Sequence, residues 1–136
     1  MSFPTTISLT ARVDMQDQLA GFVTNKQWPA VQVRWGDQHQ EHRFTHPGEQ
    51  HRFTMTARLP RGTHDVTLEF TDRTGPQGAV EIMGLHCQGT PVGLEIYQCE
   101  YRIWDTDKTE RSHLYMGRPG VWRLAIRVPR GGVGFV

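Results

Sequence analysis

Apolar and polar residues alternate with a period of two along most of the chain, whereas the 3.6-residue period of helices is almost absent. The alternation is clearest over residues 7–13, 31–35, 50–59, 64–71 and 121–128. Gly- and Pro-containing turns separate these segments. About eight short strands at this spacing predict an all-β protein, an antiparallel β-sandwich of the jelly-roll type.

Other segments are less regular. Residues 38–45 and 79–85 are predicted to be further strands. Residues 93–103 also predict a strand, but apolar side chains fall on both of its faces, as in a strand covered on both sides. Residues 104–120 are polar and long enough to form a functional loop or a subunit contact.

Length and charge limit the classes of function. A chain of 136 residues is long enough for one core, so residues 1–136 are expected to form a single β-sandwich domain. Its 15 basic and 14 acidic residues nearly cancel, which argues against nucleic acid or an anionic membrane as partner. The sequence shows neither a signal peptide nor a span of about 18 apolar residues, so we expect synthesis in the cytoplasm and no membrane insertion.

Enzyme signatures are missing from the sequence. It contains no HExxH, GxSxG or Gly-rich phosphate loop. The acidic run from Asp105 has Glu110 and Met116 where an EF-hand requires Gly and Glu. No spacing selects a catalytic pair among the strand carboxylates, Glu69, Glu81, Glu95 and Glu100. We therefore predict no enzymatic activity.

The two cysteines, Cys87 and Cys99, have no CxxC spacing. They are predicted to be small buried side chains rather than part of a disulfide framework or a zinc site.

A near-repeat draws attention to histidine. EHRFT at residues 41–45 returns as QHRFT at 50–54, on either side of a His-Pro-Gly turn. The repeat could be a metal site, a duplicated recognition element or a hairpin, and the turn favours an antiparallel hairpin. Alternation then places His39 with Glu41 on one face and His42 with Phe44 on the other, while His51 shares the face of Phe53. At most His39, Glu41 and one histidine of the partner strand could converge, whereas a transition-metal site needs three or four ligands, so a metal site is disfavoured. The histidines would instead make this surface sensitive to pH near 6.

Several segments between residues 7 and 85 together resemble a known family. They are ISLTAR, WPAVQVRWGD, HRFTMTARLPRGTHDVTLEFTD and AVEIMGL. In order and character they are similar to the calcium-dependent, xylan-binding type of carbohydrate-binding module. The resemblance implies a module-like core at residues 7–85, followed by extra strands and a tail at 86–136.

The same resemblance implies a calcium ion held by an acidic loop, and here the sequence departs from the family. The loop FTDRTGPQG keeps only Asp72, and Arg73 follows it. Calcium prefers six to eight oxygen ligands, which this loop does not supply. Asp72 is the one position to which a metal role can be carried, and we expect the calcium site to be lost and no cofactor to be needed.

The segment GVWRLAIRVP, with the aromatic stretch before it, resembles small phage virion proteins built on such a sandwich. This resemblance implies a structural subunit on the virion, such as a head or tail decoration or an adaptor. Its partners would then be other virion proteins and further copies of itself.

Exposed aromatic side chains would be the contacts for a glycan, because sugar C–H faces stack on aromatic rings. The candidates are Trp28, Trp104, Tyr97 and Tyr101. Trp35 and Trp122 continue apolar faces, so we expect them in the core.

An interface is predicted near the C-terminus. Arg123, Arg127 and Arg130 form a basic stripe, and the glycine-rich tail ends in Phe135 and Val136. The tail could fray or lodge in a neighbouring subunit. Two hypotheses follow: a virion structural protein that contacts host-surface polysaccharide, or a stand-alone glycan-binding module.

Overall fold

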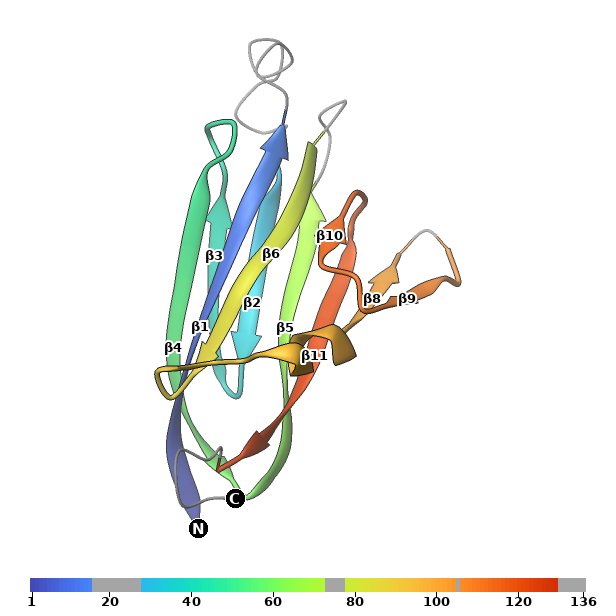
Figure 1. The fold of residues 1–136 in the computed structure, drawn as a ribbon. Coiled ribbons are helices and arrows are strands. Elements are labelled where there is room, and N and C mark those ends of the chain that lie inside the picture. The colour runs from blue at the N-terminus through green and yellow to red at the C-terminus, as the bar shows by residue number, and fades with distance from the viewer. Residues whose placement is uncertain (16–27, 73–77, 105, 130–136) are drawn as a thin grey trace.

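The computed structural model describes residues 1–15, 28–72, 78–104 and 106–129, and these form two antiparallel sheets packed face to face (Figure 1). The predicted all-β sandwich is confirmed. Among the described residues, no helix is long and apolar enough to cross a membrane.

The first sheet is built on the N-terminal strand. Its strands are β1 (Ser2–Met15), β4 (Gln50–Pro60), β6 (Gly78–Cys87), β7 (Thr90–Pro91) and β10 (Tyr115–Met116). They run in the order β10-β6-β1-β4, with β7 paired to β6.

The second sheet carries most of the C-terminal half. Its strands are β2 (Ala30–Trp35), β3 (Gln38–Arg43), β5 (Gly62–Asp72), β8 (Glu100–Ile103), β9 (Thr109–Arg111) and β11 (Gly120–Val128). The order is β3-β2-β5-β11-β8-β9. Because β11 lies between β5 and β8, the C-terminal strands are part of the sandwich itself.

The core lies between the sheets and takes every second side chain of the long strands. Trp35 and Trp122 are fully buried there, as predicted. The Trp35 indole N–H donates to the Thr5 carbonyl oxygen at 3.0 Å, which satisfies its polar group and ties β2 to β1. Cys87 and Cys99 are also buried, as predicted.

The prediction of one strand over residues 93–103 is wrong in its first half. Leu94–Gln98 form a 3-10 helix, η2, with Ile96 N–H bonded to the Gly93 carbonyl at 3.1 Å. Only Ile96 of this helix is buried, since roughly one residue in three of such a turn faces the core. Leu94 and Ile96 are two residues apart, which is the spacing of apolar residues in a strand, but tertiary packing favours the 3-10 helix here.

The hairpin predicted for the repeated EHRFT segment is also wrong. β3 pairs with β2 and β4 pairs with β1, so the two halves of the repeat belong to different sheets. The His-Pro-Gly turn, where Gly48 has φ +73°, carries the chain from one sheet to the other. Both halves still face the same core, because Phe44 and Phe53 are fully buried.

Gly120 begins β11 at a point where two backbones meet closely. A Cβ there would overlap the Arg102 carbonyl oxygen and lie 2.8 Å from Cε1 of Tyr101. We predict that Gly120→Ala lowers the free energy of unfolding by roughly 1–3 kcal/mol, measured by chemical denaturation. Gly84→Ala, where an added Cβ meets nothing within 4 Å, is the matched control. Equal stability of the two variants would contradict this packing.

Candidate functional site

A groove of about 620 Å³ lies on the outer face of the second sheet, over β8, β9 and β11. Its polar and aromatic lining residues are Glu100, Arg102, Trp104, Asp107, Thr109 and Arg123. Figure 1 shows β8 and β9 standing out from the side of the sandwich beside β11. The side chains of Glu100, Arg102 and Trp104 line the groove while Tyr101 and Ile103 are buried, as alternation requires.

Strand register brings the central charges of the groove together. Arg123 of β11 lies directly opposite Glu100 of β8 in the antiparallel ladder. Its guanidinium donates to Glu100 Oε2 at 2.7 Å and lies 3.9 Å from Asp65 Oδ2 of β5. Arg111 of β9 approaches the other oxygen of Glu100 at 3.7 Å. One guanidinium is thus held between two carboxylates.

These contacts shift both partners toward their charged forms. The hydrogen bond from Arg123, followed by the charges of Arg123 and Arg111, lowers the pKa of Glu100 although burial opposes the shift. The same hydrogen bond, with the nearby charge of Asp65, raises the pKa of Arg123. The pair is therefore ionised at neutral pH.

Trp104 supplies the aromatic surface of the groove. Its side chain is 46% exposed. Its backbone N–H donates to the Pro119 carbonyl at 3.2 Å, which fixes the end of β8 beside the start of β11. Thr106 accepts a backbone hydrogen bond from Lys108 at 3.1 Å and so closes the turn toward β9. The structure places this predicted glycan contact at a concave, polar site.

Two other aromatic candidates are buried, which contradicts their prediction as exposed contacts. Trp28 is 4% exposed and lies just before β2, which begins at Ala30. Tyr101 is 2% exposed. Its hydroxyl accepts a hydrogen bond from Arg118 N–H at 3.2 Å and donates to the Arg118 carbonyl, so it anchors the segment before β11.

The remaining candidates do not join the groove as predicted. Tyr97 is 50% exposed, but it lies on η2 and does not line the groove. Arg123 is held by carboxylates rather than free in a basic stripe, whereas Arg127 is exposed on the same outward face of β11. Arg130, Phe135 and Val136 lie outside the described residues.

The described part of the chain holds no group of three or more His, Cys, Asp or Glu side chains arranged to bind a metal ion. Asp72, to which the calcium role was carried, ends β5, and its side chain is outside the described residues. The groove itself offers two carboxylates, Glu100 and Asp107, and Glu100 is engaged by arginine. These residues do not fit a calcium ion that prefers six to eight oxygens.

Sequence reasoning missed most of the groove. The sequence analysis does not single out Arg102 or Thr109, considers Asp107 only within the acidic run compared with an EF-hand, and considers Glu100 only as a catalytic carboxylate. One signal in the sequence could have found part of the groove: Glu100, Arg102 and Trp104 are spaced two residues apart, so in a strand their side chains share one face. Finding Arg123 on the same face required the register between β8 and β11, which the sequence does not give.

A second, smaller groove of about 260 Å³ lies at the other edge of the same sheet. Gln32, Glu41 and Arg43 are among its lining residues, and its described lining includes no Trp, Tyr or Phe. Because it lacks such a stacking surface among the described residues, it is the weaker candidate for a sugar.

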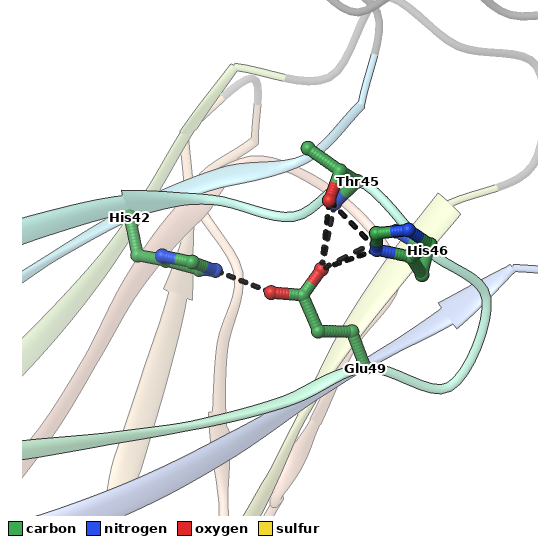
Figure 2. A network of polar contacts seen from close by, with 4 residues as sticks. All are labelled: His42, Thr45, His46 and Glu49. Atoms are coloured by element: carbon green, nitrogen blue, oxygen red, sulfur yellow. Dashed lines mark hydrogen bonds and ion pairs between the residues drawn. The ribbon is translucent and has the colours of Figure 1, made fainter.

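The histidine repeat joins the edges of the two sheets. His42 of β3 stacks on His51 of β4 with ring centroids 3.8 Å apart and planes at 9°. Figure 2 shows Glu49 between the imidazoles of His42 and His46. Glu49 Oε2 lies 2.6 Å from His42 Nε2, and Oε1 accepts the Thr45 backbone N–H at 2.7 Å.

Electrostatics within this cluster favour an uncharged His51. Burial, followed by the nearby charge of His42, lowers the pKa of His51, and Glu49 opposes the shift only partly. Burial raises the pKa of Glu49, but hydrogen bonds from the Thr45 backbone and from His42 outweigh it and hold the pKa below its usual value. Glu49 is therefore charged near neutrality beside the stacked pair.

Comparison with solved structures finds the same fold in carbohydrate-binding modules. A structure of vCBM60 in complex with galactobiose aligns with a TM-score of 0.54 and 15% identity, covering 89% of this chain and 99% of that one. A selenomethionine form of vCBM60 gives a TM-score of 0.57 and 16% identity, covering 88% and 89%. That second structure belongs to work on circular permutation linking two families of calcium-dependent carbohydrate-binding modules.

The chain has the fold of a carbohydrate-binding module. The predicted resemblance to calcium-dependent carbohydrate-binding modules is thereby confirmed at the level of the fold, and the predicted resemblance to phage virion proteins is not addressed by these two structures. At 15% and 16% identity, however, the similarity establishes the fold and leaves the ligand to be argued from the residues. No protein-family profile and no curated protein sequence matches the chain.

The depressed pKa of His51 predicts a loss of stability in mild acid. The unfolded chain takes up a proton near the usual pKa of 6.5, whereas the folded chain does so at lower pH, so the unfolded state binds more protons in between. Stability therefore falls as the pH drops below about 6.5. The lowered pKa of Glu49 removes further stability only in stronger acid.

Thermal unfolding between pH 7 and pH 5 measures this effect. We predict that Tm falls over this range and that His51→Gln flattens the dependence, whatever it does to Tm at pH 7. His39→Gln, at an exposed position of β3, is the control and keeps the wild-type slope. A His51→Gln variant with the same slope as the wild type would refute the assignment.

Proposed function

We propose that this protein is a non-catalytic glycan-binding module that holds its ligand in the groove over β8, β9 and β11. The observation that carries the proposal is the half-exposed Trp104 indole in an open groove beside carboxylate, guanidinium and hydroxyl groups. An apolar face with a few placed polar groups is the common form of a small-ligand site.

The chemistry of the groove suits a sugar ring. A pyranose presents a C–H face that stacks on an indole and an edge of hydroxyls that both donate and accept hydrogen bonds. Arg102 can donate, Asp107 can accept and Thr109 can do either. The site therefore offers a stacking surface with both kinds of polar partner beside it.

The fold supports the same function. The two similar structures are carbohydrate-binding modules, and one of them is in complex with galactobiose. Galactobiose is therefore a reasonable first probe for this chain. The proposed contacts use only the described lining residues of the groove, and none of them is given a metal to bind.

The virion location stays a prediction. It rests on the sequence resemblance of GVWRLAIRVP, and neither the fold nor the groove bears on it. A glycan-binding subunit on a particle would serve adhesion to a host-surface polysaccharide, and a stand-alone module would use the same groove. Antibody detection of the protein on purified particles would decide between them.

Trp104→Ala tests the function directly. We predict that the variant loses glycan binding by about thirtyfold or more, because truncating a central aromatic contact costs roughly 2 kcal/mol or more. Calorimetry with galactobiose, or a glycan array where another sugar binds better, measures the loss. Tyr97→Ala removes an equally exposed aromatic ring outside the groove and is expected to bind as the wild type does. Loss in Tyr97→Ala but not in Trp104→Ala would place the site elsewhere.

Calcium is expected to be dispensable for this binding. The described lining of the groove supplies two carboxylates, one of them held by arginine, which is too few oxygen ligands for calcium, so we expect removal of the ion to leave the contacts with the sugar in place. Affinity measured in EDTA and in millimolar calcium is predicted to agree within about twofold. A requirement for calcium would show that the ligand is held by other residues.

A further inference from the structure

The charges around the groove are compensated within the protein. Among the described lining residues, Glu100 and Asp107 provide two carboxylates and Arg102 and Arg123 provide two guanidinium groups, so their formal charges cancel. Arg123 is the most constrained of them, between Glu100 at 2.7 Å and Asp65 at 3.9 Å. A guanidinium already held in this way has little capacity left for an anionic ligand.

We propose that Glu100 is the specificity-determining residue of the groove: it holds Arg123 and keeps anionic glycans out. This inference rests on the proposed function and adds the class of ligand that the site rejects. A carboxylate or sulfate on the sugar would face Glu100 and Asp107, and of the two described lining arginines Arg123 is already held by Glu100. Hydroxyl groups suffer no such repulsion.

Three positional facts single out Glu100 rather than its neighbours. It lies directly across the ladder from Arg123, which fixes their pairing by register. It also contacts Arg111 through its second oxygen, so one carboxylate occupies two arginines. Asp65 reaches Arg123 only at 3.9 Å and does not line the groove. Loss of the Glu100 charge therefore removes ion pairs from two arginines at once.

Glu100→Gln removes one negative charge while keeping the size of the side chain, and it replaces one of the two acceptor oxygens with an NH2 donor. Arg123 would then retain an ion pair only with Asp65, at the longer distance of 3.9 Å, and Arg111 would lose its described ion pair with Glu100. The lining would gain one net positive charge beside Arg102. We expect the variant groove to accept a sulfated glycan.

The test compares a neutral galactan with a sulfated galactan of the same backbone, by affinity electrophoresis and calorimetry at low and physiological salt. The wild type is expected to bind the neutral polymer at least about tenfold more tightly than the sulfated one. Glu100→Gln is expected to gain about tenfold or more for the sulfated polymer, and the gain should shrink as salt rises.

Glu41→Gln is the matched control, because it makes the same charge change on β3 at the far edge of the same sheet. It should keep the wild-type preference. Three results would overturn the role of Glu100 while leaving the groove as a glycan site. The wild type could prefer the sulfated polymer, Glu100→Gln could show no gain for that polymer, or Glu41→Gln could show the same gain. Failure of the wild type to bind any glycan overturns the proposed function and, with it, the inference.

Discussion

The position of β11 between β5 and β8 determines both the core and the groove. Because side chains alternate along a strand, the register that places Trp122 opposite buried Tyr101 also places Arg123 opposite Glu100 on the outer face. A slip of one residue would expose the first pair and bury the second pair of charges. Gly120 permits this register, since its missing side chain lets β11 start against the carbonyl of Arg102.

The opposite edge of the sandwich is closed in a different way. β3 and β4 belong to different sheets and do not share a ladder, so side chains join them. His42 stacks on His51, and the Gln40 amide donates to the Thr54 carbonyl at 3.0 Å. The near-repeat in the sequence thus marks two sheet edges that meet over one core, and the imidazoles make that closure sensitive to acid.

The sequence predicts the fold well because alternation reports burial directly. It identifies the inward faces of β1, β4 and β11, and it places Trp35 and Trp122 in the core. It fails where pairing is non-local or where short segments turn: the EHRFT repeat was assigned to one hairpin, and residues 94–98 to a strand. Of the aromatic candidates, only Trp104 lies in the groove, since Trp28 and Tyr101 are buried by packing that alternation alone does not reveal.

Trp104 is expected to form the sugar-stacking surface, and the indole N–H signals of the protein test this role most directly. The chain has four tryptophans, of which Trp28, Trp35 and Trp122 are buried. In a titration of ¹⁵N-labelled protein with galactobiose, or with the best sugar found on an array, we predict that the Trp104 indole signal moves and saturates while the buried three stay in place. Saturable binding that leaves the Trp104 signal unchanged would contradict the account.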